Sequence, residues 1–256
     1  MDFLYAVIFG LVEGITEFLP VSSTGHLVLT AHLLGIRQTE FAKNFEITIQ
    51  LGAILAVVVL YAKPFLLDFK VLWRLFAAFV PTAILGLLLY KVVKHTLLNQ
   101  TQVILWSLFL GGVTLIVFEI FHKEKENALE DVRDISWWQC LAIGVVQSLA
   151  IIPGVSRSAA TVVGGLGLGL KRKTILQFSF LLAVPTMFAA TTLDLFKSDT
   201  SFSSRQWLLL GLGFLVSFVV AIFAIQLLSR YIKHHNFVIF GVYRIAISLL
   251  FWFVIR

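Results

Sequence analysis

Residues Trp207–Leu228 read WLLLGLGFLVSFVVAIFAIQLL, a run of 22 residues without one charged side chain. About 20 apolar residues are enough for an α-helix to cross the hydrocarbon core of a bilayer. Similar runs recur along the chain, for example at Ile47–Ala62, and 59% of all residues are hydrophobic whereas only 13% are charged. A soluble domain of this length needs far more charge to cover its surface. The sequence therefore predicts an all-α integral membrane protein.

Six segments have the length and composition of complete spans, and two more are interrupted at their middle by polar residues. The predicted spans are 41–62, 71–90, 102–121, 175–196, 205–228 and 238–255. The interrupted segments are 3–34, broken by Pro20 and the polar residues around it, and 138–170, broken by Pro153-Gly154 and Ser156-Arg157-Ser158. Non-helical backbone at membrane depth is tolerated only where protein or water surrounds it. We therefore predict that each interrupted segment is a re-entrant pair of half-length helices.

The two interrupted segments resemble each other. Gly10-Leu-Val-Glu13 is echoed by Gly144-Val-Val-Gln147, and Pro20-Val-Ser-Ser23 by Pro153-Gly-Val-Ser156, the second pair with an offset of 153 − 20 = 133 residues. A single membrane domain (1–256) is thus predicted to contain one half at 1–121, a polar, solvent-exposed linker at 122–136 and a second half at 137–256. Each half holds one re-entrant pair and three spans, and because three is odd the second half enters from the opposite side. Such an inverted-topology repeat places its site near the bilayer midplane, between the repeats.

The net charge of +6 does not point to nucleic acid, because the basic residues lie in short loops, where positive charge sets topology and contacts anionic lipid. Membrane lipids, and no nucleic acid, are the expected partners. Eleven basic residues fall on the linker side: Lys63, Lys70, Arg74, Lys123, Lys125, Arg133, Lys171, Arg172, Lys173, Arg230 and Lys233. Seven fall on the other: Arg37, Lys43, Lys91, Lys94, Lys197, Arg205 and Arg256. The positive-inside tendency predicts a cytoplasmic linker.

Ionisable residues inside apolar segments are functional candidates because they are costly in lipid. Glu13 and Glu17 are four residues apart, so a helix presents both carboxylates on one face. That arrangement suits a divalent cation or general acid–base chemistry, and the alternative is that one carboxylate only braces the following loop. Glu119 and Asp194, in contrast, lie at predicted span ends and are expected to be solvated.

The polar loops add hydroxyl groups, an imidazole and a guanidinium. Ser22-Ser23-Thr24-Gly25-His26 precedes an apolar helix, where free N–H groups and the helix dipole favour an anion, although simple N-capping is the alternative. Arg157, between Ser156 and Ser158, offers a planar fork for two phosphate oxygens. A carboxylate base, a hydroxyl nucleophile, an imidazole and a guanidinium together indicate phosphoryl transfer.

The residues Glu13-Gly-Ile-Thr-Glu17-Phe-Leu-Pro-Val-Ser-Ser-Thr-Gly-His26 and Pro153-Gly-Val-Ser-Arg-Ser158 resemble the two signature motifs of bacterial undecaprenyl-pyrophosphate phosphatases of the bacitracin-resistance type. Phe45–Gly52 and Phe178–Pro185 extend the resemblance over nearly the full chain. Ala159 departs from the glycine that the family often has there. The resemblance implies hydrolysis of a C55 polyprenyl diphosphate lipid to the monophosphate and inorganic phosphate, which recycles the carrier for peptidoglycan synthesis. It also implies a bacterial cell-membrane location and an active site that opens to the extracytoplasmic side.

The family's essential residues map onto seven positions here: Glu13, Glu17, Ser23, Thr24, His26, Ser156 and Arg157. We accordingly expect Glu17, Ser23, His26 and Arg157 to be catalytic, and Ser22, Thr24, Gly25, Ser156 and Ser158 to bind substrate. Glu13 and Glu17 are expected to hold a divalent cation, Mg²⁺ or Ca²⁺. The nucleophile stays open between Ser23 and His26, and a homodimer stays open beside a monomer. The alternatives are a transporter or flippase of a lipid-linked phosphate and a non-catalytic scaffold of paired charges.

Overall fold

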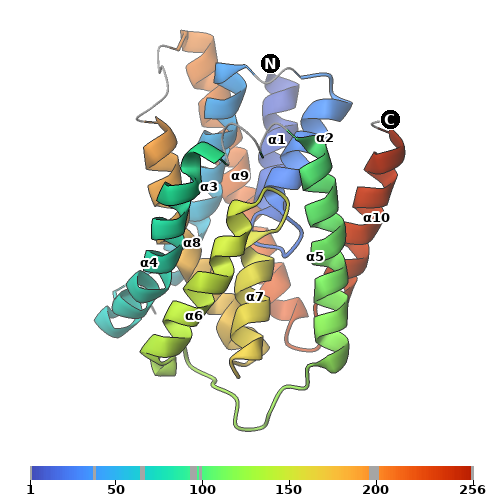
Figure 1. The fold of residues 1–256 in the computed structure, drawn as a ribbon. Coiled ribbons are helices and arrows are strands. Elements are labelled where there is room, and N and C mark those ends of the chain that lie inside the picture. The colour runs from blue at the N-terminus through green and yellow to red at the C-terminus, as the bar shows by residue number, and fades with distance from the viewer. Residues whose placement is uncertain are drawn as a thin grey trace.

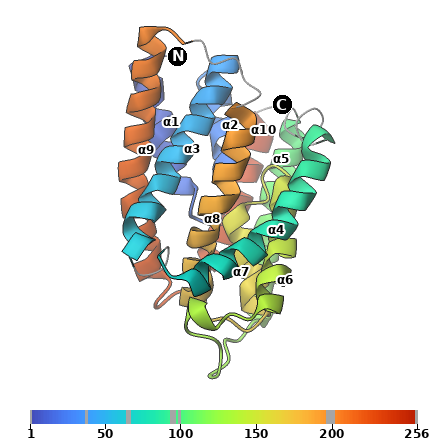
Figure 2. The same ribbon diagram turned by 90° about the vertical axis from the view of Figure 1, so that its left-hand side faces the viewer.

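The computed structural model describes residues 2–36, 39–63, 67–92, 97, 100–195 and 202–254. Within these ranges the chain is helical, as predicted, and forms an elongated bundle (Figure 1). Both termini lie at one end of the bundle and the linker lies at the other (Figures 1 and 2). The described residues do not include Arg37, Lys94, His95, Lys197 or Arg256. Four of these, all except His95, belong to the predicted charge asymmetry, so part of that prediction concerns residues that the structure does not describe.

Among the described residues, five helices are long and apolar enough to cross a membrane: α3 (Glu40–Tyr61), α4 (Phe69–Val92), α5 (Thr101–Phe121), α8 (Arg172–Leu195) and α9 (Ser204–Tyr231). Their bounds agree with five of the predicted spans to within a few residues. The sixth predicted span corresponds to α10 (Val238–Val254), an apolar helix of 17 residues within the described part of the chain. These long apolar helices make the chain a multi-pass membrane protein.

The two interrupted segments form pairs of short helices. The first contains α1 (Phe3–Thr16) and α2 (Ser23–Leu33). The second contains α6 (Trp137–Gln147), the short 3₁₀ helix η4 (Ser148–Ile151) and α7 (Arg157–Gly167). In Figures 1 and 2 the pairs extend from opposite ends of the bundle, and their connecting loops approach each other near its middle. We call residues 17–26 the first loop and residues 152–158 the second loop, and each includes the start of the helix that follows, α2 or α7.

Glycines allow the short helices to pack closely on the long ones. Helix α1 packs on α9, and α6 packs on α4. A Cβ atom at Gly14 would lie 2.7 Å from the carbonyl oxygen of Ser217 in α9, and one at Gly144 would lie 2.1 Å from that of Ala78 in α4. The long helices that follow the two pairs correspond in the same way, since α3 packs on α9 and α8 packs on α4. Helices α1 and α3 thus share α9 as a partner in one half, and α6 and α8 share α4 in the other.

The linker is anchored more firmly than its polar sequence predicts. Val132, in the short 3₁₀ helix η3 (Val132–Asp134), and Ile135 are buried in the hydrophobic core. Leu129 forms an isolated β-bridge with Leu170, and the backbone carbonyl of Ile135 accepts a hydrogen bond from Arg74 Nε at 2.6 Å. The expectation of a solvent-exposed linker is therefore wrong for these apolar residues, because burying them outweighs the polarity of their neighbours.

Candidate active site

The two loops meet through Glu17, Ser23 and Arg157. The Ser23 hydroxyl donates a short hydrogen bond to Oε2 of Glu17, and Nη2 of Arg157 lies 3.4 Å from Oε1 of the same carboxylate. Arg157 Nη1 also donates to the carbonyl oxygen of Ser179 at 2.7 Å, whereas its Nε has no hydrogen-bond partner among the described residues. Glu17 and Ser23 are buried. A serine and a carboxylate that are 6 residues apart thus form one contiguous polar cluster with a guanidinium 140 residues beyond the carboxylate.

Glu13 lies one turn before Glu17, on the same face of α1, as its spacing predicts. The helical hydrogen bond from Glu17 N to Glu13 O, at 2.9 Å, continues through this turn. Glu13 is completely buried, and no donor among the described residues reaches either of its carboxylate oxygens. The charges that act on it include those of Glu17 and of Glu46 in α3, and the opposite charge of Arg157. Because Arg157 is one cation among three carboxylates, the set favours a further proton or cation.

These carboxylates suit a Mg²⁺ site that substrate and water complete, and not a site built from protein ligands alone. The described residues include no cluster of three or more His, Cys, Asp or Glu side chains suited to a metal, so a complete protein cage is absent from that part of the chain. Mg²⁺, however, is usually held by one or two carboxylates together with substrate phosphates and water. The unpartnered oxygens of Glu13 are suitable ligands for a cation bound in that way.

His26 is held through both of its ring nitrogens. Its Nδ1 lies 2.8 Å from the carbonyl oxygen of Ser22, and its Nε2 lies 2.8 Å from the hydroxyl of Tyr243 in α10. The His26 and Tyr243 rings are stacked, with centroids 5.5 Å apart and an interplanar angle of 5°. The histidine is therefore close to the serine loop, but no direct bond between His26 and Ser23 is formed. The sequence had no signal for the tyrosine partner.

Ser22 and Ser156 begin the second helix of each pair in the same unusual way. Ser22 has φ 72° and Ser156 has φ 77°, and they are the only non-glycine residues with positive φ among the described residues. The hydroxyl of each caps its helix, accepting from the backbone N–H of Gly25 and of Ala159 respectively. The structural offset is therefore 156 − 22 = 134 residues, so the predicted match of Ser23 with Ser156 is displaced by one position.

The remaining predicted substrate-binding residues lie near this cluster, in different settings. The Ser158 hydroxyl donates to the carbonyl oxygen of Leu19 at 2.8 Å and so ties the second loop to the first. It also lies 3.2 Å from the Ser156 hydroxyl. Thr24 is half-buried, and Gly25 is buried against Leu108 of α5. The hydroxyls of Ser156 and Ser158 thus have partners within the protein, whereas Arg157 keeps one free donor.

Arg244 of α10 binds the backbone of both loops, a role that the sequence analysis did not identify. Its guanidinium is completely buried and donates five hydrogen bonds of 2.9–3.2 Å, all to backbone carbonyl oxygens. The acceptors are Pro20 in the first loop, Gly154 and Val155 in the second, and Ser107 and Leu108 in α5. The sequence marks Arg244 as an intramembrane charge, but only the fold shows that it joins three segments.

Glu119 lies away from this cluster and has an ion-pair partner of its own. Glu119, predicted to be solvated, is buried, because its carboxylate lies 2.5 Å from Nη2 of Arg172 and accepts from the backbone N–H of Phe237.

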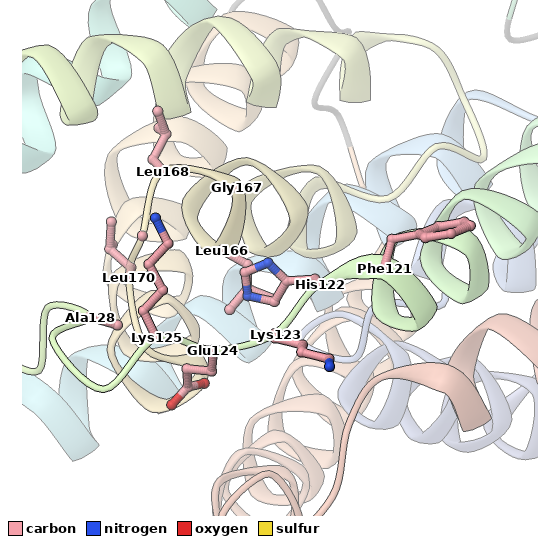
Figure 3. A pocket seen from close by; sticks show the side chains of 11 residues that line it. Phe121, His122, Lys123, Glu124, Lys125, Ala128, Leu166, Gly167, Leu168 and Leu170 are labelled. Atoms are coloured by element: carbon pink, nitrogen blue, oxygen red, sulfur yellow. The ribbon is translucent and has the colours of Figure 1, made fainter.

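A cavity of about 640 Å³ lies at the linker end, and none of the predicted site residues lines it. Figure 3 shows Lys123 and Lys125 extending to opposite sides of this cavity, so its charges do not converge.

Comparisons with known proteins agree with the two motifs. The family model described as "Bacitracin resistance protein BacA" matches residues 6–250. The chain is 52% identical over 246 residues to the undecaprenyl-diphosphatase of Aquifex aeolicus, with 96% of both chains covered. It is 51% identical to that of Sulfurihydrogenibium sp., covering 98% of this chain and 99% of the relative. It is 49% identical to that of Wolinella succinogenes, covering 99% and 98%.

Proposed function

The chain is a member of the bacitracin resistance protein BacA family, and we propose that it hydrolyses undecaprenyl diphosphate to undecaprenyl phosphate and inorganic phosphate. The observation that carries this proposal is the cluster of Ser23, Glu17 and Arg157, in which a hydroxyl, a carboxylate and a guanidinium from two loops meet. The names of the relatives favour a hydrolase over the transporter alternative. The activity would recycle the lipid carrier for peptidoglycan synthesis and confer resistance to bacitracin.

Ser23 is the better nucleophile on geometric grounds. Its hydroxyl already donates to Glu17, so the carboxylate can accept the proton as the oxygen attacks the terminal phosphorus. Both nitrogens of His26, in contrast, have partners. In this scheme the bond from the terminal phosphorus to the bridging oxygen breaks and undecaprenyl phosphate leaves. Water then hydrolyses the phosphoserine, releasing inorganic phosphate.

Arg157 and the start of α2 would hold the diphosphate. The free Nε of Arg157 can donate to a phosphate oxygen, and the N-terminus of α2 adds the positive end of a helix dipole. Glu13 and Glu17 would hold a divalent cation, Mg²⁺ or Ca²⁺, together with phosphate oxygens. When bound, such a cation offsets the charge that develops on the transferring phosphoryl group.

The membrane arrangement that best suits this function is an inverted repeat with two re-entrant helix pairs. The matching helix contacts of the two halves and the matching serine caps support it. We propose that the halves are 1–121 and 137–256, that the linker 122–136 faces the cytoplasm, and that the site opens to the extracytoplasmic side of a bacterial cell membrane. Labelling of single cysteines at 63–74 from outside, ahead of those at 91–101, would contradict this topology.

The test of the activity is phosphate release from C55 or farnesyl diphosphate by purified protein in detergent. The wild type, Ser23→Ala and Arg157→Ala are each assayed with and without Mg²⁺ or Ca²⁺. We expect turnover by the wild type that both substitutions abolish. Because detergent removes the second compartment, phosphate release identifies an enzyme. A folded wild type that releases no phosphate with any cation would instead favour the lipid transporter.

A further inference from the structure

The histidine of the first loop has a partner that the second loop lacks. His26 Nδ1 lies 2.8 Å from the carbonyl oxygen of Ser22, which is an acceptor only, so Nδ1 carries the proton of this bond. In the neutral ring Nε2 then has a lone pair, and the Tyr243 hydroxyl at 2.8 Å donates to it. The Ser22 carbonyl thus selects the tautomer of His26, and Tyr243 holds the ring in place by donating to its other nitrogen.

The second loop serves as an internal comparison. Ser156 has nearly the same positive φ as Ser22, and its carbonyl oxygen accepts from the backbone N–H of Ala160, as that of Ser22 accepts from the N–H of His26. Position 160, which corresponds to 26 at the offset of 134, is alanine and supplies no ring. A left-handed serine at this helix start therefore does not require a histidine. The hydrogen-bonded pair of His26 and Tyr243 lies at the helix start that carries Ser23, and the corresponding start of α7 has no such pair.

We propose that Tyr243 is a positioning residue for the proposed reaction: through His26 it fixes the Ser22 carbonyl and so holds the Ser23 hydroxyl on Glu17. This inference rests on the proposed function for its kinetic part. Tyr243 is placed for such a role because the next residue in α10, Arg244, binds the Pro20 carbonyl of the same loop. The first loop is thereby held at Pro20 by one residue and at Ser22, through His26, by its neighbour.

The substitution that isolates this contact is Tyr243→Phe, which removes the hydroxyl and keeps the stacked ring. Because a small displacement of a nucleophile is costly, we expect kcat to fall about 10- to 100-fold while KM changes little. The matched control is Tyr231→Phe, since the Tyr231 ring also stacks on a histidine, His235, at 4.4 Å. That substitution should leave kcat unchanged. Equal kcat values for Tyr243→Phe and the wild type would overturn the proposal.

Two further measurements separate positioning from other roles. Nitrogen NMR of the labelled protein, with the His26 signal assigned through a His26→Gln variant, should show protonated Nδ1 in the wild type and a shifted Nε2 signal in Tyr243→Phe, where the donor to that nitrogen is lost. A wild-type ring protonated at Nε2 alone would refute the inference, and this readout needs no activity. In a His26→Ala background, Tyr243→Phe should cause no further loss of kcat. A full additional loss there would mean that Tyr243 acts on the substrate directly.

Discussion

The hydrogen bond between Ser23 and Glu17 predicts that the two residues act as one unit. Glu17→Gln keeps an oxygen that can accept from Ser23 but removes the charge that would take its proton. Ser23→Ala removes the nucleophile and leaves the carboxylate in place. If the serine is activated through this bond, either substitution alone disables the same step.

The expected size of the effect follows from that contact. Removing a general base costs about 10²- to 10⁴-fold in rate, which corresponds to about 3–5 kcal/mol of transition-state stabilisation. Ser23→Ala should lose at least as much. The double variant should be about as slow as the slower single variant, because residues acting as a unit are not additive. The coupling free energy should therefore equal the smaller single effect, about 3 kcal/mol or more.

The assay is kcat for phosphate release at saturating substrate, measured for the wild type, both single variants and the double variant. Glu17→Gln also removes the ion-pair partner of the partly buried Arg157, so thermal unfolding in detergent must confirm that each variant is folded. Ser248→Ala is the matched control: this serine is also buried, and its hydroxyl donates to the Ile245 carbonyl of its own helix. It should retain wild-type kcat.

The result that would refute the reasoning is additivity. Should the free-energy losses of the single variants sum to that of the double variant within about 0.5 kcal/mol, Ser23 and Glu17 would act independently. Intact-mass measurement during turnover adds a second check. A phosphoryl group trapped on His26 instead of Ser23 would exclude the serine as nucleophile.

Three further predictions concern the support of the site and the linker end. Gly111→Ala should lower both kcat and the melting temperature, because a Cβ there would lie 2.1 Å from Nη2 of Arg244 and would displace the guanidinium from the loop carbonyls. Glu119→Gln should destabilise the fold by about 1–3 kcal/mol in detergent unfolding, because it removes one carboxylate partner of the half-buried Arg172, which then keeps only its pair with Glu124. The Arg133 hydrogen bond holds the pKa of Asp68 below its ordinary value, so their pair stabilises the fold above about pH 4. That stabilisation should disappear as the pH falls through the folded-state pKa, and the melting temperature of the wild type should then approach that of Asp68→Asn.

The first two of these predictions have control variants in the same chain. Gly211→Ala adds a methyl group where nothing lies within 4 Å, so it should be harmless where Gly111→Ala is not. Glu126→Gln changes an exposed carboxylate and should leave stability unchanged. A constant difference in melting temperature between the wild type and Asp68→Asn across the acid range would contradict the third prediction.

Sequence reasoning placed the long helices to within a few residues and identified the residues that meet at the two loops. Both results depend on local information: an apolar run identifies a span by its length, and the motifs around Glu17 and Arg157 are contiguous. Reasoning failed where the partner was distant. Glu119 was expected to be solvated because it lies at a span end, and its partner Arg172 is 53 residues further along the chain. The linker was expected to be exposed because it is the most polar stretch, whereas the burial of Val132 and Ile135 depends on the helices around them.

The amino-acid sequence alone determines that this chain resides in a membrane, because the transfer of apolar side chains from water to lipid is a sum over composition that needs no fold. It also determines which polar residues are costly there and so are candidates for function. The tertiary structure decides which partner each of them has. His26 and Tyr243 are 217 residues apart, and Arg244 reaches three separate segments. Hydrogen bonds need donor and acceptor within about 3 Å, and only the packing of the helices sets that separation.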